Sequence, residues 1–136
     1  EVKAGGVKFL LVHGSPRKNN EDILPDTPLS EVEKMLENVD ADVVLCGHTH
    51  IPCGFQTESR KTVVNAGSIG RTFFVEPNSY PKACYLIIEV DNGSCVFQHQ
   101  FVEYDKEQAS EKLAAREFEG ADKLAGMLIN PEIRHF

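Results

Sequence analysis

Three histidines follow apolar runs that have the character of buried strands. His48 and His50 are separated by one residue and come directly after the apolar run at residues 43–46. His13 occupies the same position after the run at residues 7–12. Neutral imidazole is a good ligand for Zn, Mn, Fe or Ni, and side chains two positions apart on extended backbone project to the same side. The pattern predicts one shared metal site built by the three histidines.

A helix is expected between the two strands that carry these histidines. Residues 7–12 and 42–46 are almost continuous apolar runs, as in parallel strands that are covered on both faces. Turn residues fill the loop at 14–28, and a helix is expected from Ser30, where Ser30 and Glu33 would form a capping box. In such a strand–helix–strand unit the two strands run parallel, and ligands bind at their carboxyl ends. Both histidine loops are therefore expected at the same sheet edge.

Shorter strands and a helical tail are expected after the histidines. The segment Asp91-Asn92-Gly93 is a hairpin turn signal, and Gly120 is expected to break the helical tail, because glycine disfavours helix interiors. His99 and His135 are expected to be ordinary exposed or hydrogen-bonded histidines. The expected strands span residues 51–57, 62–65, 84–90 and 95–102, and the expected helical tail runs from residue 107 to about 128.

Composition indicates one compact domain and excludes several classes of function. The 136 residues are 41% hydrophobic, with a net charge of −7 and scattered Lys and Arg, so non-specific nucleic-acid binding is not expected. No stretch approaches the roughly 20 apolar residues of a membrane span. Four cysteines occur without a CxxC pair, which favours reduced thiols and a cytoplasmic protein.

Three segments together resemble the calcineurin-like metallophosphoesterases, most closely the small bacterial and archaeal branch. They are Val12-His13-Gly14-Ser15-Pro16, Cys46-Gly47-His48-Thr49-His50 and Asn65-Ala66-Gly67-Ser68-Ile69-Gly70. Their order, spacing and strand placement agree with the family over roughly residues 7–103. The resemblance implies an α/β fold in which residues 1–136 are a single partial domain, the C-terminal half of a four-layer α-β-β-α sandwich.

The resemblance also implies a binuclear metal centre and a hydrolytic reaction. His13 and His48 would bind one divalent metal ion and His50 the other, with Mn, Ni, Fe or Zn as candidates. Two cations lower the pKa of a bridging water and neutralise charge on the phosphoryl oxygens. The implied function is hydrolysis of a phosphomonoester, a phosphodiester or a nucleotide, with a small phosphorylated molecule as substrate.

The family motifs D-x-H, G-D-x-x-D and G-N-H-D do not occur in these residues. Three imidazoles carry no negative charge to balance a two-metal cluster, so we expect the segment to be inactive by itself. The missing N-terminal half would be supplied by the same chain or by another. An isolated half would expose the sheet face that meets this partner, and poor solubility or self-association is then expected.

Five further residues are candidates for substrate contact. The loop at residues 65–70 is rich in glycine and follows a strand, so its backbone N–H groups could face a phosphate. A plain tight turn is the alternative. Arg17 could clamp a phosphate through a bidentate guanidinium, and a solvated loop arginine is the alternative. The substrate-binding candidates are Arg17, Asn65, Gly67, Ser68 and Arg71.

Three alternatives stay open at this level. The first is a non-catalytic protein-binding scaffold on the same fold, since the retromer scaffold subunit carries a similar Cys-Gly-His-Thr-His segment. The second is a one-metal hydrolase that uses the three histidines and a water molecule. The third is a Cys/His zinc knuckle at residues 46–53, although a structural zinc site usually gathers its ligands from two paired clusters.

Overall fold

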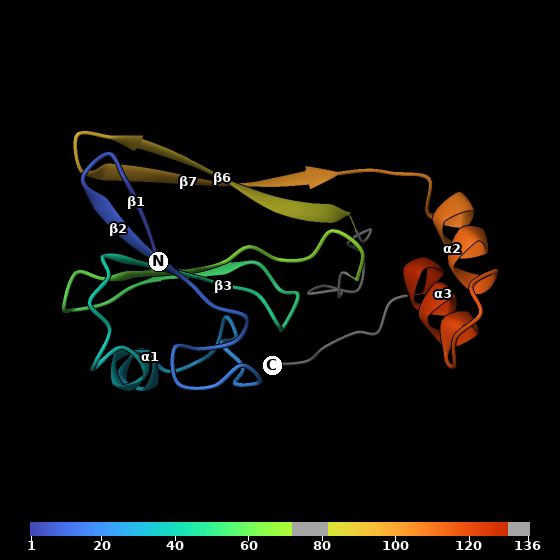
Figure 1. The fold of residues 1–136 in the computed structure, drawn as a ribbon, viewed down its shortest axis with the longest axis horizontal. Helices are drawn as coiled ribbons and strands as arrows, with labels where there is room; N and C mark the ends of the chain where they lie inside the picture. Colours follow the sequence, from blue (N-terminus) through green and yellow to red (C-terminus); the bar gives the residue numbers. More distant parts are fainter. Residues whose placement is uncertain (72–81, 131–136) are drawn as a thin grey trace.

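The computed structural model describes residues 1–71 and 82–130, and His135 lies outside this part of the chain. The elements form a sheet, a helix on one of its faces and a β-hairpin on the other, with two further helices to one side (Figure 1). The strands are β1 Val2–Ala4, β2 Val7–Leu11, β3 Val43–Cys46, β4 Cys53–Gln56, β5 Thr62–Asn65, β6 Ala83–Asp91 and β7 Ser94–Val102. The helices are α1 Leu29–Met35, α2 Lys106–Ala114 and α3 Ala121–Ile129.

The larger sheet has five strands in the order β1-β2-β3-β5-β4. The central strands β2, β3 and β5 are mutually parallel, and the two edge strands pair antiparallel to their neighbours. Leu10 pairs with Val44, and Val44 pairs in turn with Val63. The predicted parallel pairing of the strands that precede His13 and His48 is confirmed.

Helix α1 covers one face of this sheet and closes the main hydrophobic core. Val32 and Leu36 are at most 2% exposed and pack in one cluster with Val44 and Val63 of the central strands. Ile23, from the long loop before the helix, joins the same cluster and is 1% exposed. The loop that follows His13 is therefore anchored in the core near its middle.

The predicted capping box is wrong. Helix α1 begins at Leu29 with Pro28 at the N-cap, and no side chain caps its first turn. The fixed φ of proline suits a helix start, and it moves the start one residue before Ser30. The Glu33 carboxylate instead accepts hydrogen bonds from the backbone N and Oγ of Ser59, at 3.2 and 3.0 Å. A tertiary contact has replaced the local one.

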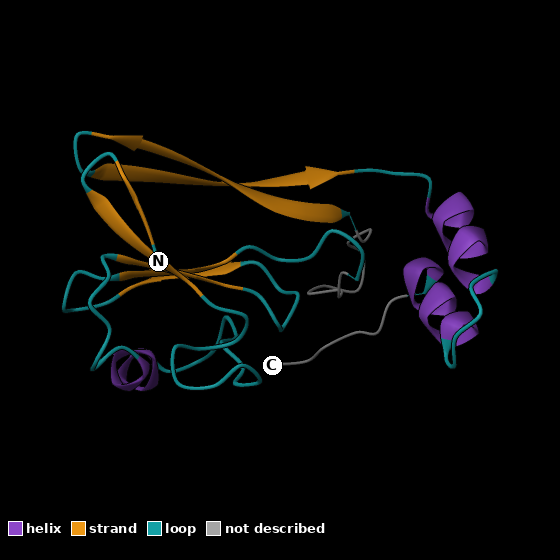
Figure 2. Ribbon diagram, viewed as in Figure 1, coloured by secondary structure: helices purple, strands orange, loops and turns teal. Residues whose placement is uncertain are grey.

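The hairpin formed by β6 and β7 lies over the other face of the sheet and makes a second β layer (Figure 2). Ile88 and Phe97 on its inner side pack against Phe9 and Val43 of the larger sheet. Its turn is the predicted Asn92-Gly93, with φ of 46° and 83°, between the paired residues Asp91 and Ser94. The order helix, sheet, second β layer confirms the predicted α/β class.

The C-terminal helices α2 and α3 pack chiefly against each other, to one side of the layers (Figure 1). The Asp105 carboxylate caps α2 by accepting a hydrogen bond from Gln108 N at 2.8 Å. Gly120 separates the two helices at a φ of 86°, a conformation that glycine adopts without strain. The predicted helical tail and its break are confirmed. No helix in the described residues has the length and apolar character needed to cross a bilayer.

Candidate metal centre

The pairing of β2 with β3 continues past the ends of both strands and sets the position of His13. Val12 N donates to Leu45 O at 2.9 Å, and Gly47 N donates to His13 O at 2.9 Å. These two bonds extend the parallel ladder by one step, because neither loop turns away before the first histidine. His13 is thereby held beside Gly47, the residue that precedes His48.

His13 and His48, which we call the histidine pair, are in direct contact. His13 Nε2 and His48 Nδ1 lie 3.0 Å apart, and the two rings meet edge to face with centroids 4.9 Å apart. His50 is half-buried on the same loop. Both His48 and His50 have positive φ, 66° and 62°, which is uncommon for residues with a side chain. Such backbone outliers gather at functional sites.

Asn65 holds the turn that contains His48 and His50. Its side chain is fully buried, and Nδ2 donates to Gly47 O at 2.7 Å and to Thr49 Oγ1 at 2.9 Å. Its Oδ1 accepts from Gly67 N at 3.0 Å. Thr49, at 1% exposure, is the buried residue between the two histidines. One amide thus joins the histidine loop to the loop that follows β5.

The spacing of the histidine pair fits two ligands of one metal ion. Metal–nitrogen bonds of about 2.1 Å that meet at a right angle place their nitrogens about 3.0 Å apart. His13 Nε2 and His48 Nδ1 are hydrogen-bonded to each other at 3.0 Å, a separation that matches that spacing. Residues 1–71 and 82–130 nevertheless hold no group of three His, Cys, Asp or Glu side chains that could hold a metal ion. A metal ion held by the pair would need ligands from outside these residues, and a self-sufficient three-histidine site is not supported.

Sequence reasoning missed a carboxylate beside the pair. Asp22 Oδ1 lies 3.4 Å from His48 Nε2, on the ring nitrogen that does not face His13. The preceding Glu21 is bound by Arg17, whose Nε and Nη2 donate to its two carboxylate oxygens at 3.1 and 2.7 Å. The hydrogen bonds from Arg17, and then that from the Ser15 hydroxyl, hold the pKa of Glu21 below its ordinary value. No spacing rule predicts Asp22, since only the path of the loop brings it to His48.

The predicted substrate contacts stay predictions, and the structure shows other partners for several of them. The Arg17 guanidinium is hydrogen-bonded to Glu21, and the Asn65 side-chain amide is hydrogen-bonded to three groups of the protein. The backbone N of Gly67 donates to Asn65, and Arg71 N donates to Ser68 Oγ at 3.0 Å. The geometry of the loop at residues 65–70 is that of a hydrogen-bonded turn, and a phosphate would have to use its other donors.

The cysteines give no support to a zinc knuckle. All four lie in the described residues as free thiols, and Cys46 packs in the core cluster under α1. Burial raises the pKa of Cys46 to about 12 and that of Cys53 to about 11. No group of three His, Cys, Asp or Glu side chains in the described residues, these cysteines included, could hold a metal ion.

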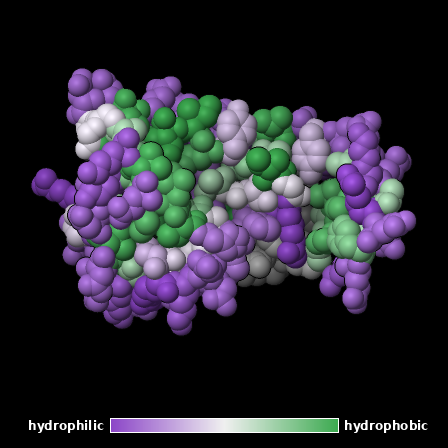
Figure 3. Space-filling view, in the orientation of Figure 1, coloured by the Kyte–Doolittle hydropathy of each residue, from purple (hydrophilic) through white to green (hydrophobic). Residues whose placement is uncertain are grey.

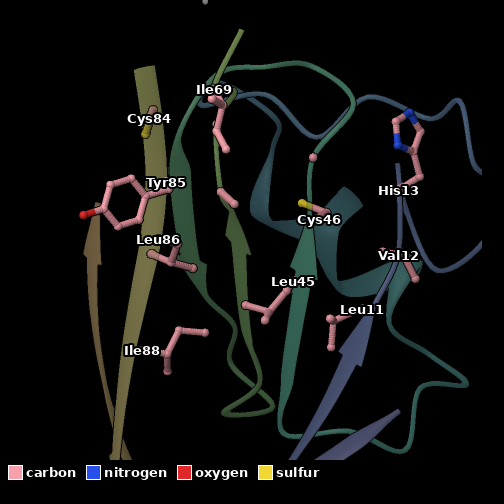
Figure 4. A pocket seen from close by; sticks show the side chains of 13 residues that line it. Leu11, Val12, His13, Leu45, Cys46, Ile69, Cys84, Tyr85, Leu86 and Ile88 are labelled. Atoms are coloured by element: carbon pink, nitrogen blue, oxygen red, sulfur yellow. The ribbon is translucent and has the colours of Figure 1, made fainter. Parts of the chain in front are cut away.

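An apolar pocket opens beside the histidine pair, between the larger sheet and the β6–β7 hairpin (Figure 4). Its volume is about 440 Å³, and His13 and Gly47 form part of its wall. Leu11 and Leu45 of the larger sheet and Ile88 of β6 also line it. Hydrophobic surface gathers around the hairpin and the adjoining strands (Figure 3). Leu11 of β2 is 55% exposed. Soluble monomeric proteins rarely expose a continuous apolar surface of this kind.

Comparison with known proteins identifies relatives of the chain. A sequence model of the calcineurin-like phosphoesterase superfamily domain matches residues 1–93. The structure resembles hypothetical protein PH1004 from Pyrococcus horikoshii OT3, with 27% identity and a TM-score of 0.71, over 91% of this chain and 48% of that chain. It also resembles a metallophosphoesterase from Sphaerobacter thermophilus, with 21% identity and a TM-score of 0.66, over 90% of this chain and 54% of that chain.

These likenesses confirm the predicted metallophosphoesterase type of α/β fold. The chain spans about half the length of these two solved proteins, 48% of one and 54% of the other. A comparison with curated proteins found no match.

Proposed function

The chain belongs to the calcineurin-like phosphoesterase superfamily, and on this premise we propose that it supplies part of the active site of a metal-dependent phosphoesterase. His13 and His48 would bind one divalent metal ion and His50 a second. The observation that supports this most directly is the 3.0 Å approach of His13 Nε2 to His48 Nδ1 at the carboxyl ends of β2 and β3. Fold likeness alone would not carry it, because unrelated functions share folds.

Bound divalent cations would lower the pKa of a nucleophilic water and neutralise charge on the phosphoryl oxygens. The residues of this chain hold and orient the imidazoles that the cations need. Neutral histidine accepts several first-row ions, so Mn, Ni, Fe and Zn are all candidates, and two ions are proposed from the family resemblance. The substrate is proposed to be a small phosphomonoester, phosphodiester or nucleotide, with Arg17, Asn65, Gly67, Ser68 and Arg71 as candidate contacts.

We further propose that residues 1–136 form a partial domain that is completed by an N-terminal half, in the same chain or in another. Two observations support this: the chain spans 48% and 54% of its solved relatives, and the pocket beside His13 is apolar and open. The completing half would bring carboxylates, which balance the charge of divalent cations as imidazoles cannot. The segment by itself is expected to be inactive. The four free thiols favour a cytoplasmic setting.

Elemental analysis and a hydrolysis assay test the proposal together. Intact mass first shows whether an upstream segment accompanies the purified protein, and bis-p-nitrophenyl phosphate then serves as substrate. In protein that contains the upstream half, we expect bound divalent metal and hydrolysis in the wild type, loss of both in His48→Ala, and retention of both in His99→Gln. The control is matched because glutamine keeps a donor for the Asn65 carbonyl, which His99 Nε2 meets at 2.7 Å. A wild type with its upstream half present that holds no Mn, Ni, Fe or Zn and leaves this ester intact refutes the proposal.

A protein-binding scaffold on the same fold is the second candidate. Exposed apolar residues on the outer side of the hairpin favour it, since Tyr85 is 43% and Val96 is 53% exposed. The upstream sequence discriminates between the two functions. A complete G-N-H-D motif there favours catalysis, and a replaced histidine in that motif favours the scaffold.

A further inference from the structure

We propose that Asp22 is a positioning residue for the histidine pair. Its carboxylate would hold the His48 imidazole in the orientation and tautomer in which Nδ1 is available to a metal ion. The inference rests on the proposed function, because it concerns how that site binds its metal. Neither the spacing of the motifs nor the family resemblance pointed to Asp22.

The two nitrogens of the His48 ring face two different partners. Nδ1 lies 3.0 Å from His13 Nε2, and Nε2 lies 3.4 Å from Asp22 Oδ1. A neutral imidazole carries its hydrogen on one nitrogen and a lone pair on the other. A carboxylate accepts hydrogen bonds and cannot donate one, so the hydrogen belongs on the nitrogen that faces Asp22. The lone pair is then on Nδ1, where it accepts the hydrogen bond that His13 Nε2 donates at 3.0 Å.

The loop that carries Asp22 is anchored on both sides of this residue. Glu21, immediately before it, receives the Arg17 guanidinium on both carboxylate oxygens and also the Ser15 hydroxyl. Ile23, immediately after it, is 1% exposed and belongs to the core cluster under α1. Asp22 itself stands between these anchors with half of its side chain exposed. Its position is thus fixed by its neighbours rather than by its own burial.

Asp22 is placed to orient His48 and not to bind the metal directly. It meets the ring at Nε2, whereas His13 meets it at Nδ1, and the two nitrogens lie on different sides of the imidazole. Within the described residues, Asp22 does not complete a three-ligand metal group with the histidine pair. Histidine ligands of metals commonly donate their second N–H to a carboxylate, which fixes the tautomer and raises the basicity of the ligand. A residue in this position strengthens metal binding without touching the metal.

The test compares Asp22→Asn and Asp22→Ala with Asp26→Asn in the protein that contains these residues. Asp26 is an exposed aspartate in the same loop, so the control makes the same chemical change and removes the same charge. Zn²⁺ affinity is measured by competition with a chromophoric chelator. The ¹⁵N shifts of the His48 ring are measured on metal-free protein at a pH where the imidazole is neutral. Circular dichroism confirms that each variant is folded.

We expect both Asp22 variants to bind Zn²⁺ about 10–100-fold more weakly than the wild type, while Asp26→Asn keeps wild-type affinity. The metal-free wild type should show one His48 tautomer, with the hydrogen on Nε2, and the Asp22 variants a mixture. Unchanged affinity and an unchanged tautomer in the Asp22 variants overturn the inference. So does complete loss of binding, which would make Asp22 a direct ligand. A wild type that binds no metal refutes the proposed function instead, and the ¹⁵N shifts still decide whether Asp22 positions His48.

Discussion

Replacing Asn65 with alanine should destabilise the protein more than any comparable change at an exposed asparagine. The side chain is fully buried and joins three groups: Gly47 O at 2.7 Å, Thr49 Oγ1 at 2.9 Å and Gly67 N at 3.0 Å. A net hydrogen bond contributes about 0.5–1.5 kcal/mol, and a buried group left without its partner costs about 1–3 kcal/mol. Because one truncation removes three bonds, we expect a loss of about 2–4 kcal/mol in the free energy of unfolding.

Equilibrium urea unfolding, followed by far-ultraviolet circular dichroism, measures this loss. Asn38→Ala is the control, because Asn38 is exposed. A surface change of this kind is expected to alter stability by no more than about 0.5 kcal/mol. Asn65→Asp adds a second comparison, since it keeps the oxygen that accepts from Gly67 N and loses the donor to Gly47 O and Thr49 Oγ1.

The same substitution should weaken metal binding, because Asn65 holds the turn on which His48 and His50 lie. Affinity for Zn²⁺ in Asn65→Ala, measured by chelator competition, should fall even at a temperature where the variant remains folded. If Asn65→Ala matches Asn38→Ala in both stability and affinity, the buried amide is not what fixes the turn. The argument from its three hydrogen bonds would then be refuted.

Three further predictions concern other parts of the site. Gly67→Ala should cost about 2–5 kcal/mol in unfolding free energy, because a left-handed φ costs about 1–2 kcal/mol and overpacking about 1–3 kcal/mol. A Cβ at Gly67 would lie 2.8 Å from Cys84 Sγ, whereas at Gly93, with a similar φ of 83°, it would meet no atom of the described residues within 4 Å. Gly93→Ala is therefore the control in the urea titration. An equal loss of unfolding free energy in the two variants would show that contact with Cys84 is not the cause. The Cys46 thiol, whose pKa burial raises to about 12, should resist iodoacetamide at pH 8 until urea unfolds the protein, and rapid native labelling would contradict its burial. Hydrogen bonds from Arg17 and Ser15 lower the pKa of Glu21 in the folded protein below its ordinary value of 4.5. The stability that Glu21 contributes is therefore fully present above pH 4.5 and is lost as the pH falls through the folded-state pKa. The stability gap between wild type and Glu21→Gln should therefore shrink on acidification, and a gap independent of pH would contradict this.

The main strands could be predicted because their signal is local. Residues 43–46 are all apolar, with Val43, Val44 and Cys46 buried and Leu45 half-buried, and strand β3 occupies these residues. The β6–β7 hairpin followed from Asn92-Gly93, since this pair tolerates the positive φ values that a two-residue turn requires. Where neighbouring residues decide the conformation, the sequence was sufficient.

Two features of the fold escaped prediction because distant residues decide them. Strand β1 is exposed at all three positions, so no apolar pattern marks it, and it exists through its pairing with β2. The expected bond between Ser30 and Glu33 lost to a contact with Ser59, 26 residues further along the chain from Glu33. In both cases the partner lies on another element, and a local pattern cannot name it.

The candidate site divides along the same line. The approach of His13 to His48 was expected, because parallel strands end at one sheet edge and both histidines follow strand ends. The approach of Asp22 was not, because it depends on the path of a loop that Glu21 and Ile23 fix through tertiary contacts. Histidines were visible as candidates from their type and position, whereas an aspartate in a polar loop is ordinary.

The positive φ angles of His48 and His50 connect the stability of the turn to its chemistry. A residue with a side chain at such a φ costs about 1–3 kcal/mol, and it persists only where the surroundings impose it. Here the imposing group is the buried Asn65 amide, which binds Gly47 before the first histidine and Thr49 between the two. Without it the turn would be free to relax, and His48 Nδ1 would no longer be kept 3.0 Å from His13 Nε2. The strained turn is therefore the means by which the buried core keeps His48 Nδ1 and His13 Nε2 at a spacing that suits two ligands of one metal ion.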